Sequence, residues 1–259
     1  MTLPALANWE PTRTALHQAA QVVGGVRKVS VPALPNYAHL GLYVTAKGVT
    51  SGRLADGGII DLNFAERALV YTCPEASVNP IPLDGHTQQS LADALLKTMA
   101  DADHPSTIDR TKITGQTPLN PHPDAAAEYQ AALHSVYSAI ARFRGRLLGG
   151  LSPMIVWPHG FDLSTLWFAK GFEEQRDPHM NVGFSPGSAG FPRPYIYVYA
   201  SPLPDAFFDV RLPQGARFTR ETWKGIVIDY DFLREQANHE LVLEGMLTDI
   251  FAALAPLMM

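Results

Sequence analysis

Two short segments in the second half of the chain carry residue types that could do chemistry. Residues 157–162 hold His159 and Asp162, and residues 177–179 end in His179. Two imidazoles and one carboxylate can bind zinc or iron(II) with open coordination positions, or they can form an acid–base pair. We therefore name all three as candidate catalytic and metal-binding residues. In the alternative interpretation His159 and Asp162 form hydrogen bonds with the backbone at the end of a strand, and His179 lies on a solvent-exposed loop.

A second group of candidates surrounds the segment at residues 195–200, where tyrosines alternate with aliphatic residues. Period-two alternation predicts a strand with all its tyrosines on one face. Such a face can line a pocket, or it can be ordinary cross-strand packing. Arg193, between two prolines, stands before this strand and can bind a carboxylate or a phosphate. The ligand-binding candidates are His39, Ser185, Arg193, Tyr195, Tyr197 and Tyr199.

Three motifs that would assign a reaction are incomplete in this chain. Residues 183–187 match the G-x-S-x-G nucleophile elbow, but Pro186 follows the serine and has no N–H for an oxyanion hole. His239 and Glu240 begin the zinc-protease pattern H-E-x-x-H, but position 243 is a leucine. No glycine-rich phosphate loop occurs. We therefore exclude a hydrolase with this elbow, a zinc protease of this type, and a nucleotide cofactor held by a common loop.

Composition narrows the class of protein. The chain has 259 residues, of which 46% are hydrophobic and 17% charged, so it can form one large domain or two small ones. Its formal net charge of −5 and the lack of a basic block predict neither nucleic acid nor membrane as partner. The single cysteine, Cys73, excludes an intrachain disulfide and fits a reducing cytoplasm. No apolar run approaches the roughly 20 residues of a membrane-spanning helix, and the N-terminus lacks a leader pattern, so we expect a cytoplasmic protein.

Hydrophobic periodicity predicts an α+β fold made of antiparallel sheets and flanking helices. Asp124 can cap the clearest helix, and the pair Gly24 and Gly25 is expected to end the first one. Helices are predicted at about residues 11–24, 90–99, 124–148 and 243–254. Strands are predicted at about residues 40–45, 59–64, 68–73, 154–157, 163–168, 181–184, 195–200 and 225–230.

The order of helix, strands and helix occurs twice, which suggests an internal duplication. We expect an N-terminal half at residues 1–103, a connector at residues 104–123 and a C-terminal half at residues 124–259. An arginine, a proline, a histidine and an Ala-Lys-Gly triplet recur in the same order in both halves, although unequal gaps leave chance as an alternative. Two similar halves would pack about a pseudo-twofold axis, with a ligand site in the cleft between them. His39 would then correspond to His159, or it could be a capped core histidine.

Six segments stand in a distinctive order along the chain: WEPTRTALHQAAQVVGGVRK, HLGLYVTAKGVTSG, FRGRLLGGLSP, WPHGFDLSTLWF, VGFSPG and RPYIYVYASP. Together they resemble a bacterial family of domains of unknown function, number 5996, from Trp9 to about Pro204. The resemblance implies a compact bacterial cytoplasmic protein and no particular activity. It marks Phe161, Asp162 and residues 183–187 as characteristic. Members often have an acidic residue after GFSPG, where this chain has Ser188.

These observations leave three functions open. The first is a small-molecule enzyme in which His159 and His179 are metal ligands or acid–base groups, and Asp162 is a ligand or orients an imidazole. Its cofactor would be a divalent metal such as zinc or iron, and the tyrosines and Arg193 would hold an aromatic or anionic substrate. The second is a non-catalytic module that binds a small ligand in the same cleft. The third is a structural subunit that forms a homodimer through an aromatic surface.

Overall fold

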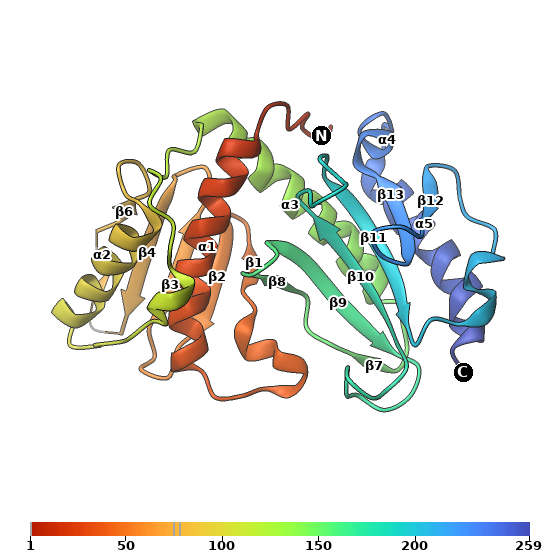
Figure 1. The fold of residues 1–259 in the computed structure, drawn as a ribbon, viewed down its shortest axis with the longest axis horizontal. Coiled ribbons are helices and arrows are strands. Elements are labelled where there is room, and N and C mark those ends of the chain that lie inside the picture. The colour runs from red at the N-terminus through yellow and green to blue at the C-terminus, as the bar shows by residue number, and fades with distance from the viewer. Residues whose placement is uncertain (1, 75, 78) are drawn as a thin grey trace. The chain divides into compact units, whose positions relative to one another are not determined.

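Two antiparallel sheets with accompanying helices make up the fold, as the α+β prediction requires (Figure 1). The computed structural model describes residues 2–74, 76–77 and 79–259. The chain forms two compact units. Residues 6–134 and 155–161 form the N-terminal unit, and residues 2–5, 135–154 and 162–259 form the C-terminal unit.

The N-terminal unit contains a meander of short strands. Its sheet has the order β1-β2-β3-β4-β5, β6 pairs with β4, and every pairing is antiparallel. The elements are α1 (Glu10–Ser30), η1 (Pro35–Leu40), β1 (Tyr43–Thr45), β2 (Gly48–Arg53), β3 (Ile59–Asn63), β4 (Ala68–Cys73), β5 (Ala76–Ser77), β6 (Ile81–Pro82), α2 (Gln88–Asp101), η2 (Arg110–Lys112), the first part of α3 (Pro123–Arg144) and β8 (Ile155–Trp157).

Helix α1 continues past the glycine pair that was expected to end it. A Cβ atom on Gly24 would lie 2.3 Å from Cγ of Pro158, and one on Gly25 would lie 2.6 Å from Cδ1 of Ile108. The two glycines therefore let neighbouring segments approach the helix closely, and they do not act as a C-terminal stop. Close packing outweighs the cost of about 1 kcal/mol that glycine carries inside a helix.

The C-terminal unit holds a larger sheet with the order β12-β13-β11-β10-β9-β7. In it β13 lies between β11 and β12, whereas from β1 to β5 the neighbouring strands of the other sheet follow one another along the chain. The structure does not confirm the predicted duplication, because the strand orders differ. The elements are the last part of α3, β7 (Gly150–Leu151), β9 (Asp162–Phe168), β10 (His179–Ser185), β11 (Tyr195–Ser201), η3 (Asp205–Phe208), β12 (Ala216–Thr219), β13 (Gly225–Asp229), α4 (Tyr230–Arg234), α5 (His239–Leu254) and η4 (Ala255–Leu257).

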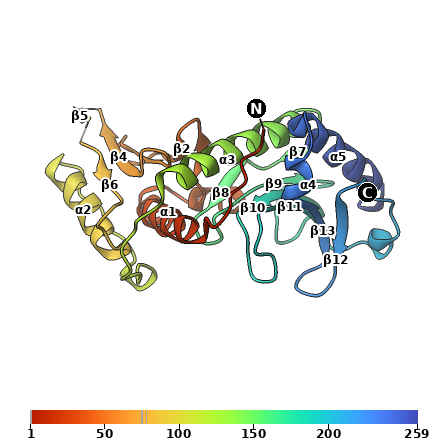
Figure 2. The same ribbon diagram turned by 90° about the horizontal axis from the view of Figure 1, so that it is seen from above.

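One face of this larger sheet forms the core of the C-terminal unit. Figure 2 shows α5 on one side of the strands. The ring of Phe251 on α5 meets Trp167 of β9 edge-on, with ring centroids 4.8 Å apart. Met180, Val182 and Phe184 alternate along β10, and all three are buried. Residues of odd number on the same strand point to the opposite face. Among the helices that the structure describes, none has the length and hydropathy needed to span a bilayer.

Candidate functional site

The predicted row of tyrosines is present on one face of β11, and this surface is here called the tyrosine face. The antiparallel register places a small or polar residue of β10 opposite each tyrosine. Directly opposed side chains in a sheet are close neighbours, so the two residues of each pair lie side by side. The three pairs are Tyr195–Ser185, Tyr197–Gly183 and Tyr199–Asn181.

The central tyrosine is held by a carboxylate from the next strand but one. The Tyr197 hydroxyl donates a hydrogen bond to Oδ2 of Asp162 at 2.5 Å. Gly183 makes room for this contact, because a Cβ atom there would lie 2.2 Å from Cζ of Tyr197. Burial, followed by the charge and the hydrogen bond of Asp162, raises the pKa of Tyr197 well above its ordinary value. The hydroxyl therefore stays protonated at neutral pH and acts as a hydrogen-bond donor.

The next tyrosine is held by an amide with one unsatisfied end. Nδ2 of Asn181 donates to the hydroxyl oxygen of Tyr199 at 2.8 Å. Asn181 is only 6% exposed, and its Oδ1 has no hydrogen-bond partner among the described residues. Turning the amide over would exchange the bonded and unbonded ends, so one end stays unpaired in either orientation. A buried polar atom without a partner costs about 1–3 kcal/mol of stability.

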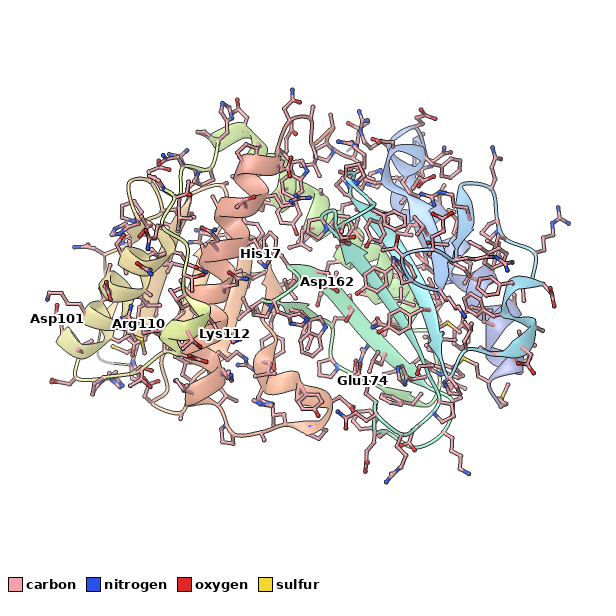
Figure 3. All side chains as sticks on the ribbon, in the orientation of Figure 1. His17, Asp101, Arg110, Lys112, Asp162 and Glu174 are labelled. Atoms are coloured by element: carbon pink, nitrogen blue, oxygen red, sulfur yellow. The ribbon has the colours of Figure 1, made fainter. Side chains whose placement is uncertain are left out.

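Acidic groups dominate the electrostatics around Tyr199. Burial raises the pKa of Tyr199, the hydrogen bond from Asn181 lowers it, and the charges of Glu174 and Asp162 raise it further. Both carboxylates are labelled in Figure 3. Asp162 begins β9, and Glu174 lies in the loop between β9 and β10. Two strand ends thus bring negative charge to one stretch of the tyrosine face.

The end of the face near Tyr195 is filled by aromatic side chains. The ring of Phe191 lies 4.8 Å from that of Tyr195, and the ring of Trp223 lies 6.5 Å from it in a stacked arrangement. The Tyr195 hydroxyl shares a hydrogen bond of 2.9 Å with Ser188. Ser185, a predicted ligand-binding residue, accepts a hydrogen bond of 3.2 Å from the backbone N–H of Gly187. This end is therefore packed, and its hydroxyl groups have protein partners.

Arg193 is tied down at the edge of a surface pocket of about 500 Å³. Its guanidinium donates two hydrogen bonds to Asp231, at 2.8 and 2.7 Å, and a third to the Ala5 carbonyl at 2.7 Å. Arg217, which also lines the pocket, is paired with Asp229 at 3.0 Å. The hydrogen bond to Asp231 is the main reason why the pKa of Arg193 is raised. Each basic group of the pocket named here thus already has a carboxylate partner.

The structure does not bring the proposed metal ligands together. Asp162 is the first residue of β9 and His179 is the first of β10, and the register places His179 opposite Phe168. The two side chains are therefore about six strand positions apart, or roughly 20 Å. Within the part of the chain that the structure describes, no three His, Cys, Asp or Glu residues gather as a metal site. The donor set does not fit the predicted zinc or iron centre.

The two histidines of that proposal have separate surroundings. His159 is exposed on the turn after β8, in the N-terminal unit, with its ring 5.8 Å from that of Trp157. His179 is buried within the C-terminal sheet, so it is not the loop residue of the alternative interpretation. Its Nδ1 lies 2.9 Å from the carbonyl oxygen of Asp177. His39 also serves its own loop, because its Nδ1 accepts a hydrogen bond of 3.2 Å from the Leu34 N–H.

The characteristic segment around His159 forms a turn that packs into the N-terminal core. The N–H of Phe161 donates to the Trp157 carbonyl at 2.7 Å, and Phe161 is buried with a φ of 57°. Its ring stacks on His17 with centroids 5.5 Å apart. Nε2 of His17 lies 2.9 Å from the Pro158 carbonyl oxygen. Burial is the main cause of the lowered pKa of His17. Local packing accounts for this segment.

A second polar cluster, between α3 and α5, has the residue types of a catalytic triad but the wrong connections. Oγ of Ser135 lies 2.8 Å from Nε2 of His239 and donates to Glu240 at 2.7 Å. In a triad the carboxylate orients the imidazole through Nδ1. Here the carboxylate bonds to the serine, and Nδ1 of His239 is buried with no partner among the described residues. The cluster joins two helices and does not activate the serine.

Asn181 and Gly183 were missed as site residues by the sequence reasoning. A signal was present, since the predicted strand at 181–184 alternates a polar residue and a glycine with two large apolar residues. A strand buried on both faces would carry apolar residues at all these positions. The alternation therefore indicates that one face of this strand has a role other than packing.

Comparisons with known proteins give one match. The family model described as "Family of unknown function (DUF5996)" matches residues 2–258. No curated protein and no solved structure matches the chain. The matched region spans both units and includes every residue of the tyrosine face.

Proposed function

We propose, for a chain that belongs to the DUF5996 family of unknown function, that the protein binds a small organic molecule on the tyrosine face of its C-terminal unit. The observation that carries this proposal is the buried Oδ1 of Asn181, which has no hydrogen-bond partner among the described residues. Buried polar atoms in native proteins are nearly always satisfied. A polar group of a ligand would supply the missing partner.

The surroundings of Asn181 support binding by a prearranged surface. The hydroxyls of the three tyrosines are each held by a polar side chain, so ordering them on ligand binding would cost little entropy. Small-molecule sites combine many apolar or aromatic contacts with a few placed polar groups. The tyrosine face has this composition, with rings along β11 and polar atoms from β9 and β10.

Binding is better supported than catalysis. The predicted His/Asp enzyme keeps only Asp162 in this site, and this residue is bonded to Tyr197. A tyrosine whose pKa is raised is a poor base at neutral pH, although it is a good hydrogen-bond donor. The groups at the centre of the face can therefore hold a ligand, but they do not form an acid–base pair.

The proposal can be tested by recovering the ligand. Native protein, an Asn181→Leu variant and a Met180→Leu control are purified in parallel, and small molecules released by denaturation are measured by mass spectrometry. Met180 is the preceding residue on β10 and faces the core, so its substitution reports on general effects of changing this strand.

We expect one compound near stoichiometric amount from the native and control proteins, and its loss from the Asn181→Leu variant. Circular dichroism must show that all three proteins are folded. Recovery of the same compound in equal amount from the Asn181→Leu variant, or recovery of none from the native protein, would count against the proposal.

A further inference from the structure

We infer that the ligand of the tyrosine face is a small organic ammonium ion that carries at least one N–H, an inference that rests on the proposed function. Three properties of the site indicate this chemical class. These are the unpaired acceptor, the charge around it and the aromatic rings beside it.

The unpaired atom of Asn181 accepts hydrogen bonds. In the observed orientation of the amide, Nδ2 donates to Tyr199 and Oδ1 is the buried atom without a partner among the described residues, so we assign Oδ1 to the ligand. The hydroxyl of Tyr197 is likewise used, because it donates to Asp162. A ligand that donates a hydrogen bond satisfies Oδ1, whereas a carboxylate or a phosphate would place acceptor against acceptor.

The charge of the site is negative. Asp162 accepts a hydrogen bond from Tyr197, and the charges of Asp162 and Glu174, both labelled in Figure 3, raise the pKa of Tyr199. Arg193, the basic group expected to attract an anion, is bonded to Asp231. A cation is therefore attracted to this part of the face, and an anion is repelled from it.

The aromatic rings favour the same class of ligand. The rings of Tyr197 and Tyr199 are stacked, with centroids 6.2 Å apart and planes 11° from parallel. The face of a tyrosine ring attracts ammonium groups, and this attraction strengthens where water is excluded. Quaternary ammonium ions would gain the ring contact but could not donate to Asn181. A protonated primary or secondary amine satisfies both features.

Benzylamine is a suitable probe, because it is protonated at neutral pH and has close analogues. Benzyltrimethylammonium keeps the charge without an N–H, benzyl alcohol keeps a donor without the charge, and benzoate reverses the charge. Each is titrated into the full-length protein after denaturation and refolding to remove retained ligand. Binding is followed by tryptophan fluorescence and by the side-chain amide resonance of Asn181.

We expect saturable binding of benzylamine, binding of benzyltrimethylammonium that is weaker by roughly 10- to 100-fold, and no binding of benzoate. Asn181→Leu should weaken benzylamine by the same factor and leave benzyltrimethylammonium unchanged. A variant that merely damages the sheet would weaken both. Met180→Leu should change neither affinity.

The inference is overturned if benzoate or benzyl alcohol binds as tightly as benzylamine, or if Asn181→Leu weakens both cations equally. Failure of the inference can be told apart from failure of the proposed function. If the native protein releases a neutral or anionic compound in an Asn181-dependent way, the proposed function stands and the ammonium class is wrong. If no compound is released and no probe binds, both are wrong.

Discussion

Gly183 offers the sharpest test of the geometry at the centre of the tyrosine face. In a Gly183→Ala variant the new Cβ would lie 2.2 Å from Cζ and 2.3 Å from the hydroxyl oxygen of Tyr197, and 2.5 Å from the Leu163 carbonyl oxygen. These separations are below any normal contact, and one of the atoms is backbone. The ring of Tyr197 must move, and its hydrogen bond to Asp162 must break or lengthen.

The cost of this substitution can be worked out from its parts. Overpacking a well-filled site costs about 1–3 kcal/mol, and losing a hydrogen bond to a charged group costs about 1.5–3 kcal/mol. Reduced backbone freedom in the unfolded chain returns about 0.4–1 kcal/mol. We therefore expect Gly183→Ala to lower the free energy of unfolding by about 2–5 kcal/mol, measured by urea denaturation.

A matched control and a second substitution make the result specific. Gly245, on an exposed side of α5, has no atom within 4 Å of its would-be Cβ, so Gly245→Ala should be neutral or slightly stabilising. Combining Gly183→Ala with Tyr197→Leu should remove the clash with the ring but not the one with the Leu163 carbonyl oxygen, so the two changes together should cost less than the sum of their separate costs. A loss below 0.5 kcal/mol for Gly183→Ala, or simple additivity in the double variant, would refute the placement of the ring over Gly183.

Three further substitutions test packing and buried titratable groups away from the tyrosine face. Gly24→Ala should destabilise by about 1–3 kcal/mol in thermal or urea unfolding, despite better helix propensity, because its Cβ would meet Pro158. Because the pKa of His17 is lowered in the folded protein, the free energy of unfolding should fall as the pH drops below about 6.5. His17→Gln should reduce the pH dependence of the free energy of unfolding between about pH 7.5 and 5.5. His239, whose pKa is also lowered, should leave part of that dependence in place. Glu244→Gln should cost about 1–3 kcal/mol by urea unfolding, because Glu244 is buried and paired with two partly exposed arginines of α3 and the following turn.

Much of the fold could be predicted because hydrophobic patterns are local. The alternating segment at residues 68–73 is strand β4, and the segment at residues 195–200 is β11 apart from its last residue. The prediction failed where tertiary contacts overrule local preference. The end of α1 was misplaced because Gly24 and Gly25 serve packing. Strand β12 was missed because it has only four residues, too few for their alternation to stand out.

The candidate site was only partly predictable, because register is a long-range property. Alternation alone placed the three tyrosines on one face, but it could not show which residues of β10 stand opposite them. The predicted antiparallel order of strands already separates Asp162 from His179. In an antiparallel pair the end of one strand lies opposite the start of the next. Two residues that begin consecutive strands therefore lie at opposite ends of the pair, and they cannot share a metal ion.

Strand β10 gives the strongest reason to look for function on the tyrosine face. Its even-numbered residues, Met180, Val182 and Phe184, are buried in the core. Its odd-numbered residues include Asn181, whose unpaired oxygen costs stability, and Gly183, which contributes no side chain to the packing. Apolar residues at these two positions would make a more stable sheet. Conflicts of this kind between sequence and stability are concentrated at functional sites, and on β10 the conflict lies on the face that carries Asn181 and Gly183.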